Sequence, residues 1–573
     1  MKLELIDYVI IGLYFLFVIG IGVMLKKRIK TGNDFLLSNR KIPLWITSLA
    51  FISANLGAQE VIGMAASGAK YGLYTVHYYW LGAVLAMIFL GVFMMPFYYG
   101  SKARSVPEYL KLRFDEKTRT FNALTFAVMT IFSSGISLYA LAMLMQIILK
   151  WNFDVSIWVA AGIVLAYIYL GGLTSAVYNE VLQFFLIVLG IAPLVYIGMV
   201  KVGGWHGILQ NVDNAKLHVW KGMGSAATNP MGVDAFSMVF GLGFVLAFGY
   251  WCTDFLVVQR AMISRNLNEA RRTPVIASIP KIAMPVIVIL PGIILLALQS
   301  KFTGFELPHN ANGDIDYNMT LPLLLSKLYP SGILGVGITA LIASFMSGMA
   351  GNVTAFNTIW TFDIYQAHIQ KNASEKHYLN VGRITTVAGI LLSILTAYVA
   401  RGFNSIMDLL QLVFSFVNAP LFATFFLGMF WKRTTSNGAF WGLISGTVAA
   451  ALTQGITTAE GKGGWIGNIH HYYSGTSQAF NIAGISFIVC FIIVTILVSM
   501  FTKRKPDEKL VGLVYSLTPK EKDKAKVLYK NPLSLGLVVL LITVILNIIF
   551  FLKNKMNKLF DLPHIAAKAL SKV

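Results

Sequence analysis

Long uncharged runs of apolar residues constrain this chain more than any other feature. Tyr8–Leu25, Phe121–Leu149 and Leu533–Leu552 are such runs, and each approaches or exceeds the ~20 residues that a helix needs to cross a bilayer core. Of all residues 56% are hydrophobic and 12% are charged, whereas soluble domains carry about a quarter of charged residues. The apolar surface must therefore face lipid, and the runs predict an all-α polytopic membrane protein with about 14 transmembrane helices.

Basic residues are unevenly placed along the chain. Lys and Arg number 46 against 25 acidic residues, a formal net charge of +21, and such a balance also occurs in proteins that bind nucleic acid. Roughly 30 of the 46 fall into alternate loops, namely 26–41, 102–119, 260–272, 371–383, 432–433 and 503–530. Cytoplasmic loops of membrane proteins are enriched in this way. The charge thus predicts topology and no nucleic-acid partner.

The ends of the first apolar run predict its orientation. Lys2, Glu4 and Asp7 precede it and several basic residues follow it, the reverse of a signal peptide. We therefore expect a retained first span with the N-terminus outside. An even number of spans would place the C-terminus outside as well, although the tail after Leu552 is rich in lysine.

Sequence signals for an enzyme are lacking. Cys252 and Cys490 both lie within apolar runs, which indicates neither a disulfide framework nor a cysteine-based metal site. The sequence contains no H-E-x-x-H helix and no glycine-rich phosphate loop. We therefore expect a protein that is not an enzyme.

Two apolar segments carry interruptions typical of transporter helices that break near the membrane midplane. Residues 52–63, ISANLGAQEVIG, place Asn55, Gln59 and Glu60 in mid-membrane, where they are costly unless they line a cavity. In the second half of the chain, 241–251, GLGFVLAFGYW, is the expected partner. Glycine also permits close helix packing, so the first segment is the stronger signal.

Other ionisable residues lie inside or at the edge of predicted spans. Together with Glu60 they are Glu180, Asp254, Lys281 and Asp408. Each should face the interior and have a partner, because a charge in lipid costs several kcal/mol. Alternatively, Lys281 snorkels to the nearby cytoplasmic surface, and Asp254 pairs with a loop residue such as Arg260.

A serine pair indicates an ion site. Ser344 and Ser347 are three residues apart and hence share one helical face. Hydroxyl and carbonyl oxygens suit a hard cation such as sodium. Serine in membrane helices also commonly bonds its own backbone, so the pair alone is a weak signal.

Short motifs along the chain carry a family resemblance. They are 34–40 DFLLSNR, 171–173 GGL, 251–260 WCTDFLVVQR, 361–365 TFDIY, and 430–433 FWKR followed by 438–442 GAFWG. In this order they resemble the sodium/glucose cotransporters within the sodium:solute symporter family. The resemblance covers about residues 5 to 530 and implies the leucine-transporter fold in a single transport domain. That fold would comprise a leading helix (5–25), two inverted five-helix repeats (43–200 and 235–430), additional C-terminal helices (438–552) and a tail (553–573).

The resemblance also implies where sodium binds. The conserved site falls on Ser53, Leu56, Ser344, Ser347 and Gly348, with hydroxyls from the serines and a carbonyl from Leu56. Gly348 stands where the sugar transporters usually have a second adjacent serine, so one hydroxyl ligand is missing. Ser53 is expected to compensate, since many relatives have alanine there.

Glu180 falls where several family members have an aspartate linked to a second cation site. The longer carboxylate shifts its oxygens by about one bond length. A second sodium ion, and with it the stoichiometry, therefore stays open.

The solute contacts of the sugar-transporting members map to residues of several spans. They are Asn55, Glu60, Tyr79, Tyr250, Trp251, Lys281 and Gln411. Amide, ammonium and carboxylate groups offer donors and acceptors to ring hydroxyls, and aromatic faces cover the apolar side of a pyranose. The resemblance makes Tyr250 the inner gate, although Tyr and Trp in membrane helices also form interfacial belts.

The pocket also departs from the family pattern. Sugar transporters carry a glutamate where this chain has Tyr79, whereas Glu60 stands on the first core helix. A carboxylate that has moved across the pocket would preserve a Glu60–Lys281 pair. It would also change which hydroxyl groups of the solute the pocket recognises.

These observations predict sodium-coupled symport of a monosaccharide or polyol by alternating access. The protein is expected in the cell membrane, plasma or inner, with sodium, a small-molecule substrate and the lipid bilayer as partners. One alternative is sodium symport of a carboxylate, amino acid or vitamin. The other is a sodium-independent sensor or channel on the same fold.

Overall fold

The computed structural model describes residues 3–26, 35, 38–310, 313–403, 405–457, 475–518, 527 and 530–560. Within these ranges the chain is helical and forms no β-strand. Residues 27–34 and 36–37, which include part of the 34–40 motif, lie outside the described residues. So do residues 561–573 of the predicted tail, whereas 553–560 continue the last helix.

The membrane-crossing segments agree with the predicted number. Eleven described helices are long and apolar enough to span a bilayer, and two strongly bent helix pairs raise the number to as many as 13. A shorter apolar helix, Phe153–Ala166, precedes the candidate span Gly172–Val202. The prediction of about 14 spans is therefore confirmed.

The first half of the chain begins with the leading helix and continues through the predicted first repeat. Its elements are α1 (Leu5–Lys26), η1 (Ser38–Arg40), α3 (Leu44–Asn55), α4 (Ala58–Tyr71), η2 (Gly72–Val76), η3 (Tyr78–Ala83), α5 (Val84–Phe89), η4 (Leu90–Met94), α6 (Met95–Gly100), α7 (Val106–Arg113), α8 (Glu116–Leu149) and α9 (Phe153–Val202). A connection containing α10 (Gly204–Asn211), η5 (Asn214–Leu217) and η6 (Ala226–Thr228) follows.

The second half has a similar series of elements. They are η7 (Ser237–Leu246), α11 (Ala247–Thr253), α12 (Phe255–Met262), α13 (Leu267–Val288), α14 (Leu290–Lys301), η8 (Tyr317–Met319), α15 (Thr320–Leu328), α16 (Ile333–Ile359), η9 (Trp360–Ile369), α17 (Glu375–Ala400) and α18 (Ile406–Phe430). The C-terminal part adds α19 (Ser436–Thr457), α20 (Gly475–Ile488), η11 (Val489–Ile496), α21 (Leu497–Phe501), η12 (Asp507–Leu510) and α22 (Pro532–Phe560).

Helix α9 is two spans rather than one. Its 50 residues would reach far beyond a bilayer core of about 30 Å if they were straight. The helix breaks at Gly172, whose φ is 53°, a conformation that glycine adopts without strain. A Cβ at this position would lie 2.5 Å from the ring of Phe35, so the 171–173 motif serves close packing at a bend.

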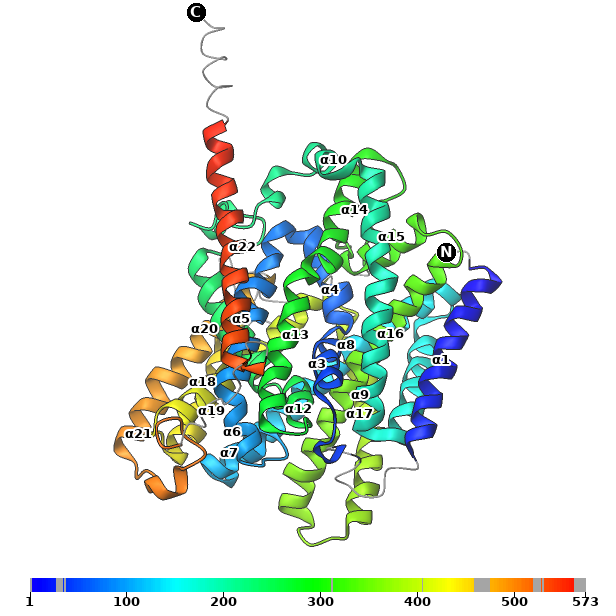
Figure 1. Ribbon diagram of the computed structural model, residues 1–573. Coiled ribbons are helices and arrows are strands. Elements are labelled where there is room, and N and C mark those ends of the chain that lie inside the picture. Colours follow the sequence, from blue (N-terminus) through cyan, green and yellow to red (C-terminus); the bar gives the residue numbers. More distant parts are fainter. Residues whose placement is uncertain are drawn as a thin grey trace, which may run out of the picture.

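The long helices run roughly alongside one another, with α3 and α4 near the centre of the molecule (Figure 1). α16 packs against α8, α9 and α1, while α3 packs against α9, α12 and α13. The face that carries the N-terminus, here called the N-terminal face, also holds α10 and α15, and α22 points towards it (Figure 1). α7, α12 and α21 lie towards the opposite face (Figure 1), so the described basic loops at 102–119, 260–272 and 432–433 share one side of the molecule.

Candidate sodium and solute site

The first core helix breaks where the sequence predicts it. α3 ends at Asn55 and α4 begins at Ala58, with a bend of 52° between them. Leu56 and Gly57 leave helical geometry, since their ψ angles are 40° and −168°. Helix ends leave backbone carbonyls without helical partners, so the break presents carbonyl oxygens inside the molecule.

α16 crosses this break and supplies hydroxyls to it. Ser344 Oγ donates to the carbonyl of Leu56 at 2.7 Å, and Ser347 Oγ donates to the carbonyl of Ser53 at 3.1 Å. Ser53 Oγ is buried and has no hydrogen-bond partner among the described residues. A buried hydroxyl of this kind suits a cation ligand, so the donor set fits sodium without any carboxylate.

Gly348 lets the two segments approach closely. A Cβ at Gly348 would lie 2.9 Å from Cα of Gly57, a distance that side chains essentially never show. The hydroxyl ligand that the resemblance leaves missing at position 348 is thus excluded by the backbone of the break itself.

All of the predicted solute contacts line a single cavity of about 60 Å³ beside the break. They come from α3 (Asn55), α4 (Glu60), η3 (Tyr79), α11 (Tyr250, Trp251), α13 (Lys281) and α18 (Gln411). A cavity of this size holds several water molecules. Side chains must part before a hexose can enter.

Lys281 is the polar centre of the cavity. Its ammonium donates to Asn55 Oδ1 and, at 2.5 Å, to Glu60 Oε1. The same Nζ lies 5.1 Å from the ring centroids of both Tyr79 and Trp251, within cation–π range. Lys281 is 1% exposed, so it does not snorkel to a surface.

Tyr250 closes one side of the cavity. Its hydroxyl accepts a hydrogen bond from Asn55 Nδ2 at 3.0 Å. Its ring stacks on Phe414 at 5.0 Å and meets Trp251 edge-on at 5.2 Å. Among the described residues, the Gln411 side chain makes one long contact of 3.8 Å, from its Nε2 to Met407 Sδ, so its amide is available to a solute.

Sequence reasoning missed several residues that line the same cavity. Met64, Met407 and Phe414 are among them. Met64 lies four residues after Glu60, while Met407 and Phe414 bracket Gln411 at four and three residues. This spacing places them on the same helical faces as the predicted contacts, a signal that was present in the sequence.

Glu180 has a different partner from the one that a cation site would suggest. Its carboxylate binds the guanidinium of Arg260 through Nη2 and, at 3.2 Å, through Nε. Arg260 also donates to the carbonyl of Leu256 at 2.9 Å, and both charged side chains are fully buried. Asp254 does not form the ion pair with Arg260 that the sequence suggested; it caps α12 by accepting from Leu256 N at 2.8 Å.

The second broken helix also differs from its prediction. Ser237–Thr253 and Phe255–Met262 form a pair bent by 49°. The break therefore lies at Asp254 and not within 241–251. Gly241 and Gly249 of that segment serve packing instead, since a Cβ at Gly241 would lie 2.7 Å from the carbonyl of Phe480 and one at Gly249 would lie 2.8 Å from that of Asn418.

An ion pair joins α4 to α18 at the N-terminal face. Lys70 Nζ lies 2.7 Å from Asp408 Oδ2, and Tyr71 donates to the same oxygen at 3.0 Å. Asp408 lies in the first turn of α18, which carries Gln411 one turn further on. Met407 and Gln411, which flank Asp408 on α18, line the cavity, so we expect this contact to cover the cavity on the side of the N-terminus.

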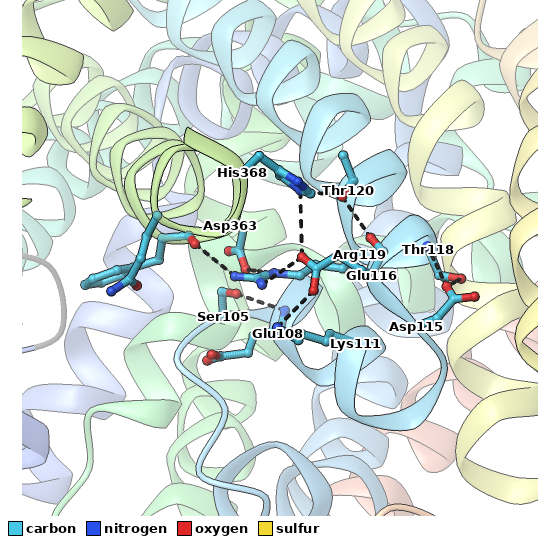
Figure 2. A network of polar contacts seen from close by, with 12 residues as sticks. Ser105, Glu108, Lys111, Asp115, Glu116, Thr118, Arg119, Thr120, Asp363 and His368 are labelled. Atoms are coloured by element: carbon cyan, nitrogen blue, oxygen red, sulfur yellow. Dashed lines mark hydrogen bonds and ion pairs between the residues drawn. The ribbon is translucent and has the colours of Figure 1, made fainter. Parts of the chain in front are cut away.

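A polar network joins α7, α8 and η9 near the opposite face (Figure 2). Arg119 binds Asp363 at 2.7 Å and Glu116 at 3.0 Å, and His368 Nε2 lies 2.8 Å from Thr120 Oγ1. Arg119 Nη2 also donates to the carbonyl of Phe362 at 2.9 Å. The TFDIY motif therefore holds the end of the α16–η9 span against α8.

Comparison with known proteins decides the family. The sequence profile of the sodium:solute symporter family matches residues 35–446, well over half of the chain. This chain belongs to the sodium:solute symporter family. It is 29% identical to a sodium/glucose cotransporter of Vibrio parahaemolyticus over 461 residues, which are 77% of this chain and 84% of that protein. It is 27% identical to a sodium/myo-inositol cotransporter of Canis lupus familiaris over 548 residues, 89% of this chain and 75% of that one.

A solved structure shares the fold of this symporter. It is that of a Na⁺-coupled sialic acid symporter in a substrate-bound outward-open state, with a TM-score of 0.74 at 21% identity. The match covers 88% of this chain and 100% of that chain. The predictions of the leucine-transporter fold, of a multi-pass membrane protein and of sodium as the coupling ion are therefore confirmed.

Proposed function

We propose that this symporter carries a neutral sugar or polyol through the cavity around Lys281, together with sodium bound at the helix break. Two relatives named as glucose and myo-inositol cotransporters support a solute of this class. The observation that carries the proposal is the pairing of Lys281 with Glu60. Because the buried ammonium already has a carboxylate, the cavity offers no uncompensated charge to an anionic solute.

The available polar groups suit ring hydroxyls. The Gln411 amide offers both a donor and an acceptor. Glu60 has acceptor capacity beyond its bond to Lys281, because a carboxylate has about four lone-pair sites. Tyr79, Tyr250 and Trp251 supply aromatic faces, which cover the apolar side of a pyranose. A carboxylate or an amino acid would instead require an unpaired cation or a matched charge pair.

Sodium couples to the solute through the break in the first core helix. The proposed ion position is surrounded by Ser53, Leu56, Ser344, Ser347 and the backbone at Gly348. Asn55 is adjacent to Leu56 in the chain and binds both Lys281 and Tyr250. An ion that fixes the backbone at Leu56 therefore favours one arrangement of the solute cavity, as differential binding to two states requires.

The Glu180–Arg260 pair favours one sodium ion per cycle over two. Both carboxylate oxygens contact the guanidinium, so a cation at Glu180 would have to displace a buried charge partner. We further propose that the N-terminal face is extracellular and that the predicted repeats, 43–200 and 235–430, form the transport core. The basic loops of the opposite face support this orientation.

A thermal-unfolding screen in detergent tests the proposal. The solutes are neutral hexoses, polyols, sugar acids and amino acids, each measured in sodium and in potassium at equal ionic strength. A ligand that binds only the folded state raises its stability, by about 2.7 kcal/mol at 100 times Kd. We expect a hexose or polyol to raise Tm in sodium but not in potassium. A sugar acid or amino acid that does so, while every neutral solute fails, would refute the assignment.

A further inference from the structure

A third helix reaches the crossing of α16 with the break. A Cβ at Gly348 would lie 2.8 Å from the Oγ of Ser137, which belongs to α8. The hydroxyl of Ser137 thus occupies the space beside the position that a serine side chain would take at residue 348. The oxygen that Gly348 lacks is present, but another helix supplies it.

This hydroxyl is buried without a hydrogen-bond partner among the described residues. Ser137 is 0% exposed and its Oγ has no partner. The same holds for Gln59 Oε1, which would lie 3.7 Å from a Cβ at Gly348, and for Ser53 Oγ on the neighbouring segment. Leaving a buried polar group without a hydrogen-bond partner is energetically costly. Three such oxygens around one backbone crossing indicate a ligand that binds oxygen.

We propose that Ser137 is a further ligand of the co-transported sodium ion and that Gln59 Oε1 lies beside it. The inference rests on the proposed sodium site at Ser53, Leu56, Ser344 and Ser347. Its chemistry is that of a hard monovalent cation held by neutral oxygens.

There is a structural reason why α8, and not position 348 of α16, supplies this oxygen. Gly348 without a side chain allows Cα of Gly57 to approach α16 closely. A serine at 348 would push the break away, whereas a hydroxyl from α8 reaches the same region from another direction. The sodium site is therefore built from three elements, the broken helix, α16 and α8, rather than from two.

Sodium binding is measured directly, without transport, on the purified full-length protein in detergent. Choline replaces sodium at constant ionic strength, and Tm is followed as sodium is titrated. The variants Ser137→Ala and Ser137→Cys remove the oxygen, the second with nearly the same volume and a soft sulfur in its place. Each should need about three- to tenfold more sodium for a half-maximal shift, as expected when one neutral ligand is lost.

Ser67→Ala is the matched control. Ser67 is also 0% exposed with an unpartnered Oγ, but it lies ten residues beyond Gly57, about 15 Å along α4. Its sodium midpoint should equal that of the wild type. If Ser137→Ala and Ser137→Cys keep the wild-type midpoint, or if Ser67→Ala shifts it equally, the role of Ser137 is refuted.

Ser347→Ala in the same titration separates this inference from the proposed function. A weaker midpoint in Ser347→Ala but not in the Ser137 variants would leave the sodium site intact and remove only Ser137 from it. An unchanged midpoint in Ser347→Ala would overturn the site itself. Should Ser137→Ala fail to fold, Ser137→Cys decides the outcome.

Discussion

At the scale of single residues, the buried pair of Glu60 and Lys281 fixes the polarity of the solute cavity. Breaking a buried ion pair by removing one partner leaves an uncompensated charge and costs on the order of 3 kcal/mol, whereas replacing both partners is far less costly. We expect Glu60→Gln and Lys281→Met each to lower the stability by about that amount. The double variant should be more stable than the sum of the two losses predicts. Thermal unfolding of the three variants forms a double-mutant cycle, and additive losses would contradict a direct pair.

At the scale of helices and their contacts, the Lys70–Asp408 pair holds α4 and α18 together above the cavity. Asp408→Asn should loosen this contact and admit reagents from the N-terminal face. With Met407→Cys as a reporter in the cavity wall, we expect labelling by a membrane-impermeant thiol reagent about fivefold faster, since such a pair contributes about 1 kcal/mol. Cys252 and Cys490 are buried, so background labelling is low. Asp314→Asn, at an exposed acid in the α14–α15 connection, is the control; equal rates in both variants would exclude a covering role.

A salt bridge at the start of α7, between Arg104 and Glu108, predicts a pH dependence. Burial alone would raise the pKa of Glu108, but hydrogen bonds and charge from Arg104 outweigh it and hold this pKa below its ordinary value. A carboxylate whose pKa is lower in the folded state than in the unfolded state stabilises the fold at pH values above its unfolded-state pKa. This stabilisation is lost as the pH falls through the folded-state pKa. Glu108→Gln should therefore lower Tm at pH 7 and converge with the wild type below about pH 4. A Tm difference that is the same at both pH values would contradict this assignment.

The element scale also shows what the sequence could predict. The break at Leu56 and Gly57 was predictable, because Asn55, Gln59 and Glu60 are costly in lipid unless they face a cavity. The break at Asp254 was not, because the glycines at 241 and 249 carry the same signal for close packing. Glu180 and Arg260 are 80 residues apart in the chain, so only the packing of α9 against the second half brings them together. Ser137 gives no local signal, since its role follows from the missing side chain at Gly348.

At the scale of the whole molecule, the proposed sodium and solute sites share one broken helix. In this proposal Ser53 and Leu56 form the ion side of the break, and Asn55 and Glu60 form the solute side. The covering contact at Lys70–Asp408 and the network around Arg119 lie towards opposite faces of the fold, as alternating access requires. The coupling between sodium and solute then follows from this one backbone segment. It needs no long chain of contacts between distant sites.

The most direct test of this coupling is solute uptake into proteoliposomes under an inward sodium gradient, with the wild type and Ser347→Ala compared at several sodium concentrations. We predict that uptake of the hexose or polyol that binds best depends on the gradient, and that Ser347→Ala needs several-fold more sodium for the same rate. Uptake at equal rates in potassium, or an identical sodium dependence of the two proteins, would contradict the account.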